Sequence, residues 1–143
     1  MELIEHVFDP GCDALICNHY KAAILTGREA IYDQLEQIHV RCRAKFAFIT
    51  CEANGIYASD GATRIRVPAY FDIHRKVVDS TRAGDAATAA IVECLLRGLT
   101  IEVAALAGVR NSFEACLAYG LTVKNTCEWN AIEDYLQVHS RIT

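Results

Sequence analysis

Short apolar runs rich in β-forming residues alternate along this chain with segments whose apolar residues recur at helical spacing. The runs lie at 13–17 and 45–51, and the helical segments between them lie at 18–27 and 28–43. Parallel strands need a crossover connection, usually a helix, so this alternation predicts an α/β fold built in layers. We expect the sheet to be mainly parallel.

One pair of runs departs from the alternation. Segments 55–59 and 63–67 flank Asp60-Gly61, a dipeptide typical of tight hairpin turns because glycine tolerates positive φ. We expect a β-hairpin here, as an antiparallel excursion from the sheet. A further short apolar run at 76–79 predicts another strand, which would lead into a turn at 80–85.

Capping residues indicate where helices begin and end. The expected helices run from Asn18 to Gly27, from 28 to about 43, from 86 to 97 before Gly98, from Thr100 to Gly120, and onward from a capping box formed by Asn130 and Glu133.

Length and charge narrow the class of protein. With 143 residues, 52% of them hydrophobic, the chain can bury one sizeable core, so we expect a single domain spanning 1–143. Its 14 basic and 18 acidic residues give a formal charge of -4, which offers no general attraction to nucleic acid or to an anionic membrane. No stretch approaches the roughly 20 apolar residues that a membrane-spanning helix needs.

The cysteines argue against a disulfide scaffold. Seven of them are scattered singly, with an odd total and no paired spacing. Neither they nor the five histidines show metal-ligand spacing, so we expect no protein metal site of that kind. Residues 1–9 lack the basic start and apolar run of a signal peptide. We therefore expect a reduced, cytoplasmic protein.

The most informative stretch is 79–86, which reads Asp-Ser-Thr-Arg-Ala-Gly-Asp-Ala. It resembles the D-T-x-G-A-G-D signature of the PfkB (ribokinase-like) family of carbohydrate and nucleoside kinases. In that family, backbone amides at a helix start form an anion hole for the transferring phosphoryl group, and the last aspartate is the catalytic base. The resemblance implies Asp85 as the base and a phosphate-binding hole at Arg82, Ala83 and Gly84, to which the Asp85 amide would add.

Three more segments resemble the family, in the same order along the chain. Residues 17–27 are similar to P-N-x-x-E-A-x-x-L-T-G, 49–55 to V-T-L-G-x-x-G, and 97–104 to R-G-x-x-x-E-A. The likeness extends over about 13–123. It implies the carboxy-terminal half of a three-layer, Rossmann-type ribokinase-like fold.

The resemblance also implies ligands. ATP and Mg²⁺ would be the cofactors, and a sugar or nucleoside would accept the phosphoryl group. The residues implied to bind the nucleotide are Thr50, Gly55, Thr81 and Asn111, with Asn18 in the network that organises metal and phosphate.

The sequence departs from the family pattern at three phosphate-facing positions. Arg82 replaces the first glycine of the anion hole; if that position requires positive φ, the cost is about 1 kcal/mol or more. Its guanidinium either blocks the phosphate or binds it. Lys21 replaces a glutamate linked to magnesium, and Glu52 replaces a glycine and brings negative charge towards the phosphates.

Two hypotheses therefore remain. In the first, the chain is an ATP-dependent kinase whose turnover is weakened or incomplete, because no segment resembles the family's amino-terminal half, which supplies sugar contacts and a lid. In the second, it is a non-catalytic remnant that binds nucleotide or another protein, and Asp85 is an ordinary acid at a helix start. The missing half would leave an apolar flank, so self-association is expected.

Overall fold

The structure of the chain, a computed structural model, describes residues 10–119 and 129–139. The chain divides into two compact units, the first ending at Arg66 and the second beginning at Val67. Whether they form the one domain expected from the length stays a prediction. Unit 1 contains β1 (Cys12–Asn18), α2 (His19–Thr26), α3 (Ile31–Cys42), β2 (Ala44–Thr50), the short 3-10 helix η1 (Glu52–Asn54), β3 (Ile56–Ser59) and β4 (Arg64–Val67), whose last residue falls in unit 2.

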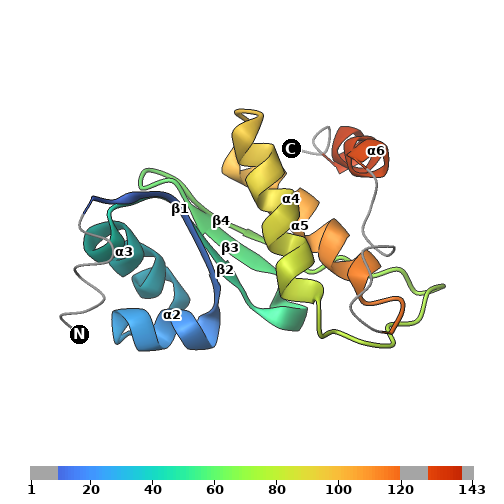
Figure 1. Cartoon of the computed structure of the whole chain (residues 1–143), viewed down its shortest axis with the longest axis horizontal. Helices are drawn as coiled ribbons and strands as arrows, with labels where there is room; N and C mark the ends of the chain where they lie inside the picture. Colours follow the sequence, from blue (N-terminus) through green and yellow to red (C-terminus); the bar gives the residue numbers. More distant parts are fainter. Residues whose placement is uncertain (1–9, 120–128, 140–143) are drawn as a thin grey trace. The chain divides into compact units, whose positions relative to one another are not determined.

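The four strands form one sheet in the order β1-β2-β3-β4 (Figure 1). β1 and β2 are parallel, whereas β2 and β3 are antiparallel. The sheet is therefore mixed, and the expectation of a mainly parallel sheet is wrong. The reason is that only one helical crossover, α2 with α3, joins two strands in the described part of the chain; β3 and β4 follow β2 through short turns.

Helices α2 and α3 cover one face of this sheet (Figure 1). Side chains that alternate along a strand point to the same face, so Ala47 and Ile49 both face these helices. The core on this face consists of Ala22, Leu35, Ile38, Ala44, Ala47, Ile49 and Cys51. Phe48 points the other way and is also fully buried, so β2 is buried on both faces.

Local hydrogen bonds at the ends of the helices follow the expected capping chemistry. Asn18 Oδ1 accepts a hydrogen bond from the Lys21 amide at 2.9 Å, and Gly27, at φ 67°, ends α2. α3 begins at Ile31, later than expected. The side-chain amide of Gln34 donates to the Arg28 and Glu29 carbonyls, which lie ahead of the first helical turn.

The hairpin expected at Asp60-Gly61 is confirmed. Asp60 Oδ1 accepts the amides of Ala62 at 3.0 Å and Thr63 at 2.6 Å, and Gly61 has φ 87°. His39 joins α3 to two strands: its Nδ1 bonds the Ala44 carbonyl at the start of β2, and its Nε2 bonds Ser59 Oγ in the hairpin, each at 2.8 Å. A carbonyl only accepts, so Nδ1 carries the proton.

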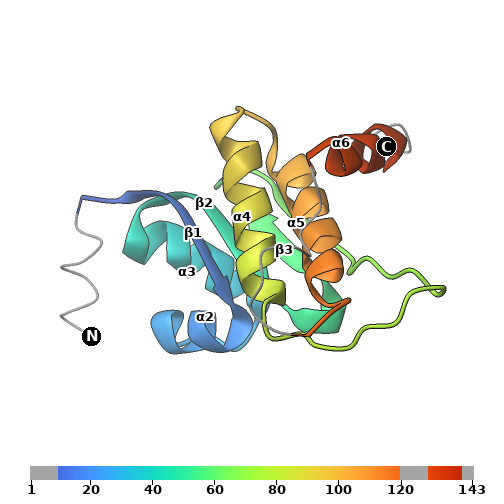
Figure 2. The ribbon, with the colours of Figure 1, turned by 45° about the vertical axis from the view of Figure 1, so that its right-hand side comes forward.

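Unit 2 contains α4 (Ala83–Leu96), α5 (Ile101–Ala115) and α6 (Trp129–His139). α4 and α5 lie side by side (Figure 2). Their buried faces carry small residues that allow close packing: Ala86, Ala87 and Ala90 on α4, and Ala104, Ala105, Ala107 and Gly108 on α5. The Arg97 guanidinium at the end of α4 lies 4.1 Å from the centre of the Trp129 ring, so this tryptophan packs against an arginine.

The expected limits of these helices need three corrections. α4 begins at Ala83, three residues before the expected start. α5 is capped by Thr100 as expected, but it ends at Ala115, and Gly120 lies outside the described residues. α6 begins at Trp129, so Asn130 lies inside its first turn.

The strand expected at 76–79 is absent. Instead, the amides of Val78 and Asp79 donate to the Cys116 carbonyl at the end of α5, at 2.8 and 3.2 Å. These donors are thus taken up by a helix end and not by a neighbouring strand. The expectation rested on a short apolar run, which by itself does not specify a pairing partner.

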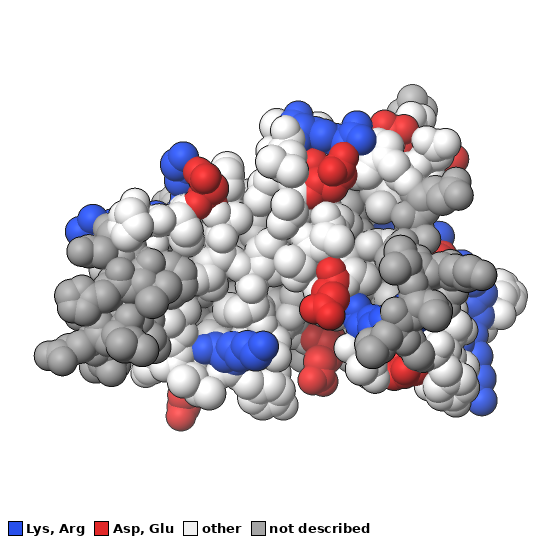
Figure 3. All heavy atoms as spheres, in the orientation of Figure 1, with Lys and Arg blue, Asp and Glu red and all other residues white. Residues whose placement is uncertain are grey.

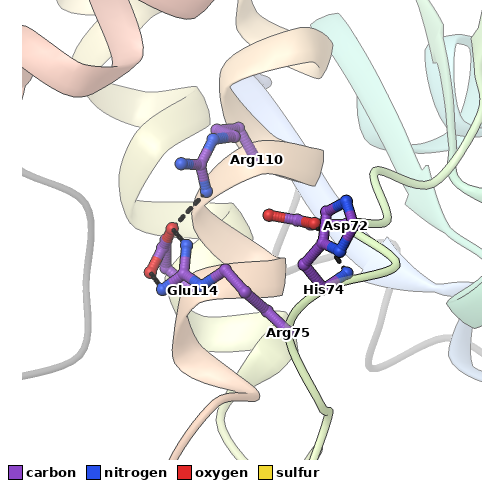
Figure 4. A network of polar contacts seen from close by, with 5 residues as sticks. All are labelled: Asp72, His74, Arg75, Arg110 and Glu114. Carbon is purple, nitrogen blue, oxygen red and sulfur yellow. Dashed lines mark hydrogen bonds and ion pairs between the residues drawn. The ribbon is translucent and has the colours of Figure 1, made fainter.

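A charged network holds the segment before α4 to α5 (Figure 4). The Arg75 guanidinium donates two hydrogen bonds to the Glu114 carboxylate, at 2.6 and 2.8 Å, and Arg110 also bonds Glu114. Arg110 lies 4.7 Å from the centre of the Tyr70 ring. Burial acts to raise the pKa of Glu114, but the bonds from the two arginines outweigh it and hold that pKa below its ordinary value.

No helix among residues 10–119 and 129–139 is long and apolar enough to cross a membrane. On the face drawn in Figure 3, acidic and basic side chains are interspersed and do not gather by sign. The six cysteines that are described are free thiols.

Replacing Glu114 with glutamine should lower the free energy of unfolding by about 1–3 kcal/mol, because charge-assisted hydrogen bonds to two arginines are lost. Glu93 provides the matched control, since its bond to Arg97 is at the surface and Glu93→Gln should cost no more than about 0.5 kcal/mol. Since folding lowers the Glu114 pKa, its contribution is present above the ordinary carboxyl value and is lost as the pH falls through the lowered value. Urea unfolding of the wild type and both variants, near neutral pH and in acid, measures these free energies. An equal loss of stability in Glu114→Gln and Glu93→Gln at neutral pH would contradict the prediction.

Candidate functional site

The turn at 79–85 in unit 2 is built by hydrogen bonds between near neighbours. Asp79 Oδ1 accepts the Thr81 amide at 3.0 Å and also the Thr81 hydroxyl. The Ala83 amide donates to the Ser80 carbonyl at 3.1 Å. These bonds turn the chain directly into α4.

Two backbone amides at the start of α4 have no acceptor among residues 10–119 and 129–139. The Ala86 amide makes the first intrahelical bond, to the Arg82 carbonyl at 3.0 Å, and the Ala83 amide is taken by Ser80. The amides of Gly84 and Asp85 have no acceptor in the part of the chain that the structure describes. Unpaired amides at a helix start, together with the helix dipole, favour an anion.

Space lies open beside Gly84. A Cβ placed on Gly84 would meet no atom within 4 Å. The Asp85 side chain in the same turn is exposed to solvent, so its carboxylate can accept a proton from a bound hydroxyl. Anion-binding amides beside an accessible carboxylate are the groups that phosphoryl transfer to an alcohol requires.

Arg82 is not strained. It precedes α4 with φ -103° and ψ 4°, so the left-handed conformation that would have penalised it does not arise. The positive charge of Arg82 affects the pKa of the Cys116 thiol. Burial raises that pKa and Asp79 raises it further, whereas Arg82 acts to lower it. The side chain is half-buried beside the end of α5.

In unit 1, two predicted site residues lie next to each other. Asn18 and Thr50 are register partners at the carboxyl ends of the parallel strands β1 and β2. Ligands of open α/β sheets bind beyond this edge. Asn18 uses Oδ1 to cap α2, and Lys21 is exposed on the first turn of that helix.

The loop after Thr50 closes on itself. The Cys51 amide donates to the Gly55 carbonyl at 2.8 Å, and the Gly55 amide donates to the Glu52 carbonyl at 3.1 Å. Gly55, at φ 90° and ψ -145°, occupies a region open only to glycine. Glu52 has φ 47°. Of the two residues that replace a glycine of the family pattern, Glu52 is therefore the strained one and Arg82 is not.

The sequence reasoning missed Arg66. Its Nε donates to the Asn54 carbonyl at 3.1 Å, and its guanidinium lies 5.8 Å from the centre of the Tyr57 ring. It is an exposed cation beside the loop. No sequence signal places it there, because twelve residues separate Arg66 from Asn54.

The remaining predicted residues have structural partners. Asn111 is buried, and its side-chain amide donates to the Ala86 carbonyl at 2.7 Å, which joins α5 to α4. The Thr81 hydroxyl is bonded to Asp79. Their roles in nucleotide binding stay predictions. Unit 1 thus groups Asn18, Thr50 and Gly55, and unit 2 groups Thr81 with Arg82, Ala83, Gly84 and Asp85.

Thiols contribute little chemistry at this site. Burial raises the pKa of Cys17 and that of Cys51 to about 11, so both stay protonated near neutral pH. No group of three or more His, Cys, Asp or Glu side chains that could hold a metal occurs within the described residues. A cavity of about 350 Å³ in unit 1 is lined by other residues, among them Glu36, His39 and Arg64.

Comparison with known proteins gives one family match. The family model described as "pfkB family carbohydrate kinase" matches residues 1–126. No curated protein sequence matches the chain.

Several solved structures share the fold. Ribokinase from Thermotoga maritima superposes with a TM-score of 0.77 at 20% identity, over 93% of this chain and 44% of that one. For phosphofructokinase-2 from Escherichia coli in complex with potassium, the TM-score is 0.76 and the sequence identity is 19%. The superposition covers 98% of this chain and 45% of that one. For the nucleoside kinase of Methanocaldococcus jannaschii, the TM-score is 0.74 and the sequence identity is 24%. The superposition covers 96% of this chain and 42% of that one. The chain therefore spans less than half the length of these relatives.

Replacing Glu52 with glycine should raise the free energy of unfolding by up to about 1 kcal/mol, because left-handed strain is relieved and the greater freedom of the unfolded chain offsets part of the gain. Arg43→Gly should act similarly, since Arg43 has φ 48°. Glu52→Gln keeps the backbone strain and removes the charge, so it should gain little. Thermal unfolding of the three variants measures the changes in stability. A gain in Glu52→Gln as large as that in Glu52→Gly would assign the effect to the charge of Glu52 and not to backbone strain.

Proposed function

The chain belongs to the pfkB family of carbohydrate kinases, and from that membership we propose that it binds ATP and transfers the terminal phosphoryl group to a hydroxyl of a sugar or nucleoside. The observation that carries the proposal is the pair of amides at Gly84 and Asp85, which have no acceptor among the described residues, beside the exposed Asp85 carboxylate. The turnover is weakened by the departures from the family pattern.

In the proposed reaction, Asp85 accepts the proton of the acceptor hydroxyl as its oxygen bonds to the γ-phosphorus of ATP. The bond from that phosphorus to the bridging oxygen breaks, and ADP leaves with the electron pair. The Gly84 and Asp85 amides donate to the phosphoryl oxygens as negative charge develops there. Asn18, Thr50, Gly55 and Thr81 are proposed to contact the nucleotide.

Magnesium would neutralise phosphate charge when bound with ATP. The protein side chains fit it poorly, since Lys21 stands where the family has a glutamate and no metal-holding cluster occurs among the described side chains. The ion would be held mainly by phosphates and water, with Asn18 as the proposed protein contribution. The Glu52 carboxylate adds repulsion at the loop.

The alternative is a pseudokinase that binds nucleotide or another protein without turnover. It is favoured by the cation at Lys21 and by the strained glutamate at position 52. The expected self-association stays a prediction.

Replacing Asp85 with asparagine should reduce phosphorylated product by about 10²–10⁴-fold, because the base is removed while the helix start is kept. The assay supplies ATP, magnesium and a panel of sugars and nucleosides, and product is quantified by mass spectrometry. Glu102→Gln is the matched control, since Glu102 lies in the first turn of α5 as Asp85 does in α4. Equal product from the wild type and Asp85→Asn would remove Asp85 from the mechanism.

Replacing Gly84 with alanine should weaken ATP binding, because the new Cβ occupies open space beside the amide that is proposed to bind phosphate. The same change should keep or raise thermal stability, since alanine is preferred to glycine within a helix by about 0.5–1 kcal/mol. Calorimetric titration measures the binding, with Val92→Ala at an exposed position further along α4 as control.

The titration also separates the two hypotheses. ATP binding without product in the transfer assay supports the pseudokinase. No heat and no thermal shift at millimolar nucleotide would leave a protein-interaction module.

A further inference from the structure

Two arginines and two tyrosines form a continuous stack in unit 1. The Arg64 guanidinium lies 5.7 Å from the centre of the Tyr32 ring, and the Arg66 guanidinium lies 5.8 Å from that of Tyr57. The tyrosine rings meet edge to face, with centroids 5.6 Å apart. Both arginines are exposed on β4, two residues apart, and therefore project from the same side of that strand.

Only one of these arginines is hydrogen-bonded to the loop at 51–55 in the described structure. Arg66 Nε donates to the Asn54 carbonyl, while Arg64 packs against α3 through Tyr32. Burial raises the pKa of Cys51, with Arg66 acting to lower it and Glu52 to raise it. Both charges therefore act at the start of this loop.

The geometry leaves part of the Arg66 guanidinium available. Nε is used on Asn54 and the Tyr57 ring lies against the group, whereas the two terminal nitrogens bond no other described residue. A guanidinium held in this way presents a planar pair of donors that matches two oxygens of a phosphate. Its positive charge also offsets the Glu52 carboxylate on the same loop.

We propose that Arg66 positions the loop at 51–55 and binds the phosphates of a nucleotide there, so that this chain prefers phosphorylated nucleosides to unphosphorylated ones. The phosphate-binding part rests on the proposed function. In this proposal, Arg66 on β4 supplies positive charge that compensates for the Glu52 carboxylate. Arg66 is thus a positioning and specificity residue.

The first test is calorimetric titration of the full chain with ATP and with adenosine. Arg66→Ala should weaken ATP binding about tenfold and make it less sensitive to salt, because one charge-assisted contact is lost, and it should leave adenosine binding unchanged. Arg66→Lys keeps the charge without the fork and should fall between. Arg64→Ala removes the same charge from the same strand and should leave ATP affinity unchanged.

Equal ATP affinity in the wild type and Arg66→Ala would overturn the phosphate contact. An equal loss of affinity for ATP and for adenosine in Arg66→Ala would show that Arg66 has a purely structural role. If the wild type binds neither ligand, the proposed function fails, and the phosphate contact fails with it.

Amide hydrogen exchange tests the positioning of the loop without nucleotide. The amides of Cys51, Asn54 and Gly55 should exchange faster in Arg66→Ala than in the wild type or in Arg64→Ala. Unchanged exchange in Arg66→Ala would overturn the positioning role, whatever the titrations give.

Discussion

The parallel pairing of β1 with β2 is the constraint on which unit 1 depends. Parallel strands require a crossover, and α2 with α3 supplies it while covering the face that Ala47 and Ile49 present. The same pairing brings both carboxyl ends to one edge, so Asn18 lies beside Thr50 although 32 positions separate them in the sequence. Everything proposed for the loop at 51–55 follows from that edge, because the loop begins where β2 ends.

The first turn of α4 leaves backbone donors open, as the first turn of an α-helix does unless a cap or a ligand takes them. The amides of Gly84 and Asp85 lack acceptors among the described residues, while the segment before them is held firmly from outside by Cys116 and by the bonds between Arg75 and Glu114. A rigid support with unpaired donors at its tip is the arrangement that binds an anion without reorganising, which is how electrostatic preorganisation contributes to phosphoryl transfer.

The departures from the family pattern have unequal physical weight. Arg82 fits its position at negative φ, so the largest sequence change in the signature costs no backbone strain. Glu52 carries left-handed strain, and the charges of Glu52 and Arg66 act in opposite directions on the pKa of Cys51. Lys21 keeps its place on α2 but removes a carboxylate, which bears on metal support and not on the fold. These differences agree with the proposal of a nucleotide site whose turnover is weakened.

Interactions between near neighbours were determined by the sequence itself. The Asn18 and Thr100 caps and the turn held by Asp60 depend on hydrogen bonds within a few residues, so residue type and spacing specify them. Tertiary structure decided what depends on distant partners: the mixed sheet, the absence of a strand at 76–79, the burial of Asn111 and the contact of Arg66 with the loop. A local apolar run or a lone arginine carries no information about which distant carbonyl or strand will meet it, because that choice is made by packing.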